Sequence, residues 1–258
     1  MSNILDVRNI SLSFGGLKAL QNVSFSVEKG QIFGIIGPNG AGKTTLFNII
    51  TGLYKPQGGS VFFMGQEISG KKPHEISRMG LTRTFQNIRL FKNLSVTENV
   101  LLGLSGNLQY GWWDMMFQTH AFCKEEEEGR QYATKLLEMF ELRQWKDALS
   151  GDLSYGSQRR VEMVRALMSR PQLICLDEPA AGMNHRETDQ LRETIQQVSQ
   201  FFNVTILLIE HDMSLVMKVC DEIIVLDHGE LIAQGEPSAI QKNQAVVEAY
   251  LGVDFHGL

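Results

Sequence analysis

Cysteine is scarce in this sequence, which limits the kinds of site that it can hold. Of 258 residues, three are cysteine (Cys123, Cys175 and Cys220), and they lie far apart without a CxxC or Cys/His ligand spacing. This argues against both a disulfide framework and a structural zinc site, and it is typical of a reducing compartment. Cys175 lies within an apolar segment, where we expect a small buried side chain.

An excess of positive charge is also absent. Lysine and arginine number 24 against 29 aspartates and glutamates, and no basic block stands out, so the composition gives no sign of a nucleic-acid partner. Glu125–Glu128 is the sizeable charge cluster, and we interpret it as the solvated start of a helix rather than a binding tail.

The sequence lacks apolar runs long enough to cross a bilayer. The longest, such as Val204–Ile209, are far too short, and the N-terminus has no basic segment followed by an apolar stretch. We therefore expect no secretory signal and a soluble cytoplasmic chain. Any association with the membrane is then expected to come through a partner.

Apolar patterning predicts an α/β fold with a mainly parallel sheet. Residues 5–12 and 23–27 alternate as half-buried strands do, and residues 32–36 form the apolar run expected of a strand covered on both faces. Further strands are predicted at residues 61–64, 173–176, 204–209, 223–226 and 231–233. Helices are expected between the first three strands after residue 173, which completes the α/β alternation.

Residues 95–158 differ from the rest of the chain. They contain helical patterning, including Tyr132, Leu136 and Phe140, and no convincing strand. We predict one domain in which residues 1–94 and 159–258 form the α/β core and residues 95–158 form an inserted helical subdomain.

A phosphate-binding motif follows the strand at residues 32–36. The stretch Gly37-Pro-Asn-Gly-Ala-Gly-Lys-Thr44 satisfies GxxxxGK[ST] and precedes a predicted helix at residues 43–51. Its glycines let backbone N–H groups turn inward around phosphate oxygens, and the positive end of the helix points at the same anion. Lys43 is expected to neutralise the β- and γ-phosphates, and Thr44 to bind Mg²⁺ through its hydroxyl. A glycine-rich turn with an unrelated lysine is the alternative.

Nine residues of this segment are predicted to bind the nucleotide. They are Gly37, Pro38, Asn39, Gly40, Ala41, Gly42, Lys43, Thr44 and Thr45.

Two carboxylates end the apolar strand that starts at residue 173. Asp177 and Glu178 follow Leu173-Ile-Cys-Leu176, at the sheet edge where α/β proteins bind ligands. Asp177 is expected to hold the magnesium, directly or through water, and Glu178 to orient and deprotonate the attacking water.

Other stretches identify a family. Leu153-Ser-Tyr-Gly-Ser-Gln-Arg-Arg160 resembles the signature motif of ABC ATPases, and Gln86, within TRTFQ, resembles their Q-loop. His211 resembles their switch histidine, and Phe14 falls where the family places an aromatic ring against adenine. The segment 180–184 resembles the D-loop. The resemblance covers essentially the whole chain in the right order.

This resemblance implies a P-loop NTPase fold with an N-terminal antiparallel β subdomain and an inserted helical subdomain. It also implies a head-to-tail dimer that holds two MgATP, each between the phosphate loop of one subunit and the signature motif of the other. Ser154 would donate its hydroxyl there, Gly156 would let the backbone approach, and a helix expected to begin near Ser157 would point at the γ-phosphate. Gln86 would bind the metal and also take part in catalysis. His211 would take part in catalysis.

Taken alone, these residues have simpler interpretations. Phe14 is compatible with an ordinary strand aromatic, Gln86 with a surface amide, and His211 with a structural histidine. Only its place at a strand end, on the same sheet edge as Asp177, distinguishes His211 from the other histidines of the sequence.

Departures from the broad pattern suggest a subfamily. The signature reads LSYGS where LSGGQ is commonest, and Asn184 replaces the usual aspartate of the D-loop. The strings RTFQNIRLF, DEPAAGMN, ILLIEHDM and AYLG resemble ATP-binding subunits of branched-chain amino-acid importers. Such a subunit would pair with a second ATPase, identical or related, and with two transmembrane permeases served by an extracytoplasmic binding protein. It would then lie on the inner face of the membrane.

Two surface assignments accompany the resemblance. Residues 87–99 are the expected contact for a membrane-domain coupling helix, and Trp112 and Trp113 are expected to cap the small core of the helical subdomain rather than to contact the permease.

The sequence is compatible with other functions. The cargo is open, with urea or amide import and lipopolysaccharide export as alternatives. A non-transport ABC ATPase is disfavoured because the chain has neither a long coiled-coil insertion nor a second ATPase domain. A P-loop kinase or GTPase is disfavoured by the signature motif.

Overall fold

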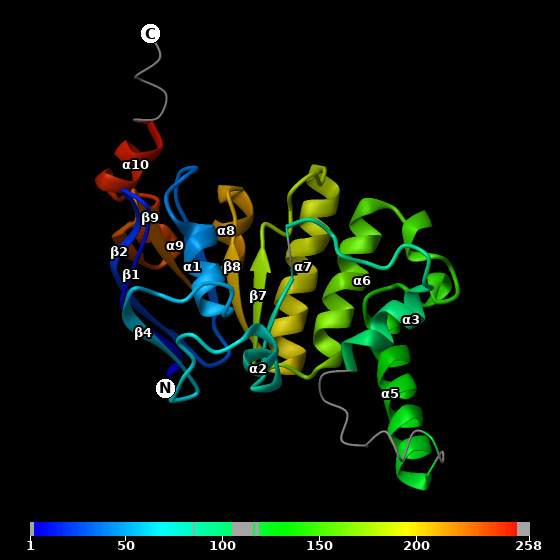
Figure 1. Ribbon diagram of the computed structural model, residues 1–258. Helices are drawn as coiled ribbons and strands as arrows, with labels where there is room; N and C mark the ends of the chain where they lie inside the picture. Colours follow the sequence, from blue (N-terminus) through cyan, green and yellow to red (C-terminus); the bar gives the residue numbers. More distant parts are fainter. Residues whose placement is uncertain (1–2, 85, 105–115, 117–118, 252–258) are drawn as a thin grey trace. The chain divides into compact units, whose positions relative to one another are not determined.

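A computed structural model of the chain describes residues 3–84, 86–104, 116 and 119–251 (Figure 1). The chain divides into two compact units, the first formed by residues 1–83 and 172–258 and the second by residues 84–171. The inserted helical subdomain that we predict at residues 95–158 lies within the second unit. Trp112 and Trp113 lie outside the described residues.

The first unit contains an antiparallel sheet at its N-terminal end, as the resemblance implies. Its strand order is β2-β1-β4-β5. The strands are β1 (Asn3–Phe14), β2 (Leu17–Glu28), β4 (Gly58–Phe63) and β5 (Gln66–Glu67). Apolar side chains on one face, such as Leu5, Val7 and Val23, are at most 2% exposed and form part of the core.

The second sheet of this unit is the α/β core, with strand order β10-β9-β3-β8-β7-β6. Its strands are β3 (Ile32–Ile36), β6 (Leu81–Arg83), β7 (Leu173–Asp177), β8 (Thr205–Ile209), β9 (Glu222–Asp227) and β10 (Glu230–Gly235). All neighbours are parallel except β9 and β10. Every residue of β3, β7 and β8 is buried, which confirms the expectation from their apolar runs.

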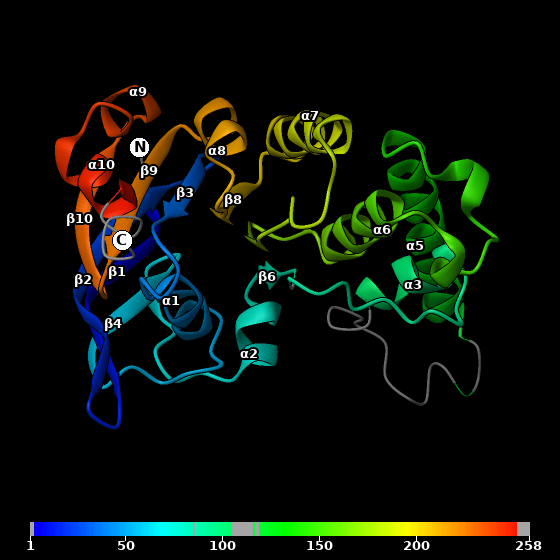
Figure 2. The same cartoon turned by 90° about the horizontal axis from the view of Figure 1, so that it is seen from above.

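Helices flank this sheet, and Figure 2 shows α7 and α8 on one side of it and α1 on the other. The helices of the first unit are α1 (Lys43–Ile50), α2 (Pro73–Arg78), α7 (His185–Phe202), α8 (Met213–Val219), α9 (Pro237–Ile240) and α10 (Gln244–Leu251). The helix predicted at residues 43–51 is confirmed as α1, which has Thr51 as its C-cap.

The second unit is helical in its described part. Its helices are α3 (Val96–Leu101), η1 (Leu102–Leu104), α5 (His120–Met139), η2 (Arg143–Trp145), η3 (Ser150–Asp152) and α6 (Tyr155–Met168). The buried side chains of α5 include Leu136 and Leu137, and Glu125–Glu128 lies in its first half.

Burial of Cys175 and the length of the helices agree with the apolar patterning of the sequence. Cys175 is fully buried in β7, and burial raises the pKa of its thiol to about 12, so it is an inert part of the core. No helix in the described part of the chain is long and apolar enough to span a membrane.

Candidate functional site

The phosphate loop joins the end of β3 to the start of α1. Gly42 is the N-cap of α1, and its φ of 101° lies in the left-handed region. A Cβ atom there would lie 2.6 Å from the carbonyl oxygen of Ala19 and 2.9 Å from a methyl carbon of Leu20. Both the backbone conformation and the close approach of β2 therefore require glycine at this position.

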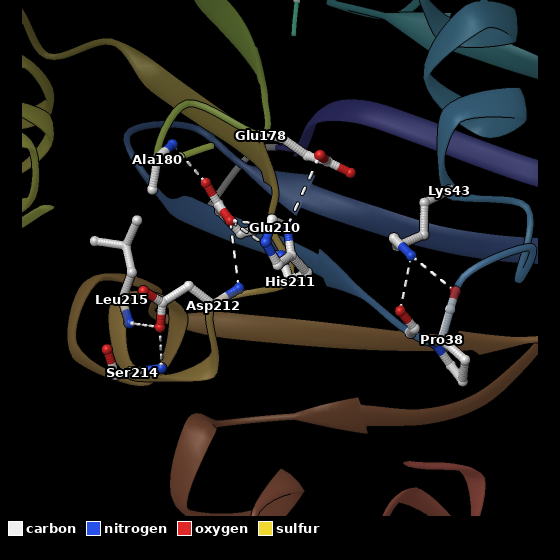
Figure 3. Close-up of polar contacts among 10 residues, drawn as sticks. Pro38, Lys43, Glu178, Ala180, Glu210, His211, Asp212, Ser214 and Leu215 are labelled. Carbon is white, nitrogen blue, oxygen red and sulfur yellow. Dashed lines mark hydrogen bonds and ion pairs between the residues drawn. The ribbon is translucent and has the colours of Figure 1, made fainter. Parts of the chain in front are cut away.

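The side chain of Lys43, the first residue of α1, folds back against the phosphate loop. Its Nζ donates hydrogen bonds to the carbonyl oxygens of Gly37 at 2.7 Å and Pro38 at 2.9 Å (Figure 3). The side chain is 7% exposed, and burial lowers the pKa of its ammonium group, an effect that the charge of Glu178 partly offsets. The carbonyl oxygens of Gly37 and Pro38 thus bind the ammonium group that the motif predicts to neutralise phosphates.

A cavity of about 500 Å³ opens on the loop and on α1. It is lined by Phe14, Leu17, Lys18, Ala19, Asn39, Gly40, Ala41, Gly42, Lys43, Thr44, Thr45, Glu178 and His228. The structure therefore brings most of the predicted nucleotide-binding residues and one predicted catalytic residue to a single cavity. Gly37 and Pro38 begin the loop without lining the cavity.

Phe14 contributes an aromatic surface to this cavity. Its side chain is 48% exposed, and its ring meets that of Tyr54 edge-on, with centroids 5.5 Å apart and planes at 70°. One neighbour thus orients the ring while nearly half of it stays accessible for a planar base. Lys18, in β2, and His228, in the turn between β9 and β10, also line the cavity, and the sequence analysis gave them no binding role because neither belongs to a motif.

Asp177 ends β7 and Glu178 follows it. Glu178 has φ of 45°, an uncommon value for a residue with a side chain, and its N–H donates to the carbonyl of Ile209 at 2.9 Å. Strained backbone of this kind costs about 1–3 kcal/mol and occurs often at functional sites. Oε2 of Glu178 lies 3.8 Å from Nδ1 of His211, which follows β8 (Figure 3). The predicted catalytic carboxylate and histidine are therefore neighbours on one sheet edge.

A buried acid lies beside this pair and was missed by the sequence analysis. The side chain of Glu210 is fully buried and accepts hydrogen bonds from the N–H groups of Ala180 (2.7 Å), His211 (3.0 Å) and Asp212 (3.3 Å). Burial raises the pKa of its carboxyl, and these hydrogen bonds act against that rise. Glu210 ties the loop after β7 to the loop after β8. A glutamate next to a histidine was visible in the sequence, but its burial was not.

In the first unit, the carboxylate of Asp177 and the hydroxyl of Thr44 provide oxygen atoms that could bind a divalent cation. Asp177 is 5% exposed and Thr44 is exposed to the cavity. Within the described ranges, no three histidine, cysteine or acidic side chains form a cluster suited to a metal. A carboxylate and a hydroxyl suit Mg²⁺, which usually takes few protein ligands together with phosphate oxygens and water.

The remaining predicted residues lie in the second unit. Gln86 has an exposed side chain, and its carbonyl accepts a hydrogen bond from Arg159. Ser154 is the N-cap of α6, where its Oγ accepts from the N–H of Ser157 at 3.3 Å, and Gly156 lies in the first turn. The expected start near Ser157 is wrong by two residues, because the hydroxyl of Ser154 caps the helix earlier.

Comparisons with known proteins agree with this arrangement. Residues 20–181 match the family model described as ABC transporter, and residues 230–256 match that of the branched-chain amino acid ATP-binding cassette transporter.

Two relatives are similar over nearly the whole chain. The chain is 46% identical over 249 residues to the high-affinity branched-chain amino acid transport ATP-binding protein BraF of Pseudomonas aeruginosa, covering 96% of this chain and 98% of BraF. It is 42% identical, with the same coverage, to the corresponding protein LivG of Escherichia coli K12.

Solved structures show the same fold. MJ1267, an ATP-binding cassette of an ABC transporter in its ADP conformation, has a TM-score of 0.86 and 37% identity, covering 98% of this chain and 100% of that one. The cassette MJ0796, a dimer bound to ADP and phosphate in a post-hydrolysis state, has a TM-score of 0.75 and 25% identity, covering 90% of this chain and 98% of that one.

Proposed function

Because the chain belongs to the ABC transporter family of ATP-binding domains, we propose that it is the ATP-hydrolysing subunit of an importer for branched-chain amino acids. The observation that carries this proposal is the cavity that joins Phe14, the phosphate loop and Glu178. It offers an aromatic surface for a base, backbone N–H groups and a lysine for phosphates, and a carboxylate for water.

The phosphate loop would bind the triphosphate of ATP. In the structure the ammonium of Lys43 donates to two carbonyls of its own loop, and we propose that it donates to β- and γ-phosphate oxygens once ATP is bound. The N-terminal end of α1 adds the partial positive charge of its unpaired N–H groups. Phe14 would lie against the adenine.

Glu178 would act as the general base. Its carboxylate would orient a water molecule toward the γ-phosphorus and accept its proton as the oxygen–phosphorus bond forms. Two features support this role: Glu178 lines the cavity, and its backbone is held in a strained conformation at a strand end. His211, 3.8 Å from Glu178, would contact the γ-phosphate side of the same site.

Mg²⁺ fits the oxygen ligands of the site. Asp177 and Thr44 would hold it, and bound Mg²⁺ would neutralise charge on the β- and γ-phosphates. Phe14, Lys43 and Glu178 would bind and orient the reactants around it.

The site would be completed by a second ATPase subunit, identical or related. Ser154 and Gly156 at the start of α6 would contact the γ-phosphate held by that subunit, with the helix N-terminus pointing toward it. The dimeric structure of MJ0796 with ADP and phosphate supports such an assembly. Two permease subunits, contacted through residues 87–99, would place the dimer on the inner face of the membrane.

The cargo assignment rests on the relatives. BraF and LivG are branched-chain amino acid transport proteins, and the C-terminal residues 230–256 match a model of that subfamily. Affinity purification of the chain from membranes, followed by identification of the proteins that accompany it, tests this. We expect two permeases of the branched-chain type. Recovery of ribosomes or DNA in their place would contradict the proposal.

A further inference from the structure

The buried ion pair between Arg83 and Asp177 links the edge strand β6 of the core sheet to its neighbour β7. Arg83 is the last residue of β6, and its Nη2 donates to Oδ2 of Asp177, the last residue of β7, at 2.6 Å. The two side chains are 9% and 8% exposed. A carboxylate buried to this extent is unfavourable without a charged partner, so Arg83 compensates the charge of Asp177.

The other guanidinium nitrogen of Arg83 reaches the end of α1. Its Nη1 donates to Oδ1 of Asn48 at 2.7 Å and to Oγ1 of Thr51 at 3.1 Å. The guanidinium carbon lies 5.5 Å from the centre of the Phe47 ring, within the range of a cation–π contact. Thr51 is itself fixed, because its hydroxyl donates to the carbonyl of Phe47 at 2.7 Å.

One side chain therefore joins the end of β7 to the helix that begins with Lys43 and Thr44. A guanidinium can do this because its donors are spread over a rigid plane, whereas an ammonium is a single point charge. One oxygen of Asp177 is occupied by Arg83. This contact fixes the orientation of the carboxylate, and within the described part of the chain no hydrogen bond to Oδ1 of Asp177 is found.

We propose that Arg83 is a positioning residue for the magnesium site. It holds the carboxylate of Asp177 and the helix that carries Thr44 in one arrangement, so that both oxygen ligands are in place before Mg²⁺ binds. The inference rests on the proposed function, since it takes Asp177 and Thr44 as the residues that hold the metal. Hydrogen-bond partners of a metal-binding carboxylate usually strengthen metal binding in this way.

Three roles of Arg83 predict different results when it is changed. A positioning role predicts weaker metal binding both without the charge (Arg83→Met) and with the charge but without the planar guanidinium (Arg83→Lys). A cation that merely repels the metal predicts tighter binding in Arg83→Met. A purely structural role predicts a lower melting temperature with unchanged metal affinity.

The test is a titration of the full chain with Mn²⁺ in the presence of ATP, followed by electron paramagnetic resonance, which distinguishes free from bound Mn²⁺. ATP binding in the presence of EDTA and thermal unfolding are measured for each variant. Arg78→Met, the same change at an exposed arginine of α2, is the matched control. Asp177→Asn is the reference for loss of the ligand.

We expect Arg83→Met and Arg83→Lys to raise the Kd for Mn²⁺ by about 10-fold or more, with metal-free ATP binding unchanged and Arg78→Met indistinguishable from the unaltered chain. Should Arg83→Met fail to fold, Arg83→Lys and Asn48→Ala, which removes one anchor, test the same point. Asn48→Ala is expected to weaken Mn²⁺ binding less than Arg83→Lys.

Two results would overturn the inference while leaving the proposed function in place: unchanged Mn²⁺ affinity in both Arg83 variants, or tighter binding in Arg83→Met, when Asp177→Asn weakens it. An unchanged affinity for Mn²⁺ in Asp177→Asn would instead show that Asp177 does not bind the metal. That result would contradict both the inference and this part of the proposed function.

Discussion

At the scale of single residues, titratable side chains of the candidate site lie at the carboxyl ends of β7 and β8. Glu178 follows β7 in a strained backbone conformation, and His211 follows β8 at 3.8 Å from it. Glu210, which precedes His211, is fully buried and accepts hydrogen bonds from N–H groups of both strand-end loops. The strained backbone of Glu178 and the buried carboxyl group of Glu210 are both unfavourable in isolation, and hydrogen bonds to neighbouring backbone groups stabilise them here.

Glu178→Gln tests the general base directly. The amide keeps the size of the side chain and cannot accept the proton of water, so ATP binding should persist while phosphate release falls by about 100-fold or more. Equilibrium binding of ATP and a phosphate-release assay measure the two quantities. Glu230→Gln, at the exposed start of β10, is the matched control and should leave both unchanged. Turnover at the unaltered rate in Glu178→Gln would remove Glu178 from this role.

Gly42→Ala tests the fit of the phosphate loop against β2. The new methyl group would meet the carbonyl oxygen of Ala19 at 2.6 Å, so the loop has to move, and we expect a loss of about 1–3 kcal/mol of unfolding free energy together with weaker ATP binding. Gly40→Ala has a similar left-handed φ, 83°, with nothing within 4 Å of the added atom. Urea denaturation should show the smaller loss in Gly40→Ala, and equal losses would show that the contact with Ala19 is unimportant.

At the scale of elements, helix starts determine how the loops of the site are held. Asn184, which replaces the usual aspartate of the D-loop, is the N-cap of α7. Its Oδ1 accepts from the N–H of Glu187 at 3.1 Å, and Oε2 of Glu187 accepts from the N–H of Asn184 at 3.0 Å, which forms a capping box. The departure from the family pattern therefore keeps a residue that caps well.

Replacing this cap gives a prediction about stability. Asn184→Ala removes the acceptor for an unpaired helix N–H, and we expect it to lower the unfolding free energy by about 1 kcal/mol, whereas Asn184→Asp should retain the stability. Chemical denaturation of the full chain measures both. A loss of equal size in the two variants would mean that the side chain acts elsewhere than in the cap.

The cap of α8 gives a prediction about pH. Burial by itself would raise the pKa of Asp212, but hydrogen bonds from Ser214 and from the N–H of Leu215 outweigh it, and the net pKa is lowered. A carboxyl whose folded pKa lies below its unfolded value of about 3.9 stabilises the fold above that value, and this stabilisation is lost as the pH falls through the folded pKa. Urea midpoints measured from neutral pH down to about pH 3 should therefore fall less steeply in Asp212→Asn than in the unaltered chain. Parallel curves would contradict the prediction.

Strands buried on both faces could be predicted from the sequence, and short polar strands could not. The apolar runs of β3, β7 and β8 indicate their position because burial on both faces demands apolar side chains throughout. By contrast, β6 has three residues, and one of them is Arg83, so no apolar pattern marks it.

In the candidate site, too, some residues could be predicted from the sequence and others could not. The phosphate loop could be predicted because its motif lies in one continuous stretch, and Glu178 because it directly follows an apolar strand. The partners of Asp177 and the burial of Glu210 depend on contacts between segments far apart in the chain, such as the 94 positions that separate Arg83 from Asp177. Contacts of this kind leave no local pattern.

At the scale of the whole molecule, the predicted site residues are divided between two compact units. The phosphate loop, Asp177, Glu178 and His211 belong to the first unit, and Gln86 and the start of α6 belong to the second. An ATP-driven closure that brings a signature motif onto the γ-phosphate would couple hydrolysis to the movement of permeases. The chain is therefore expected to hydrolyse ATP at its full rate only when assembled with its partners.

Reconstitution tests this central claim most directly. The measurement is phosphate release and leucine uptake by proteoliposomes that contain the chain, its partner ATPase and both permeases, with and without leucine-loaded binding protein. We predict that the loaded binding protein stimulates hydrolysis, that leucine enters only when ATP is hydrolysed, and that Glu178→Gln abolishes uptake. A rate of ATP hydrolysis that is the same with and without the binding protein, together with no leucine uptake, would contradict the account.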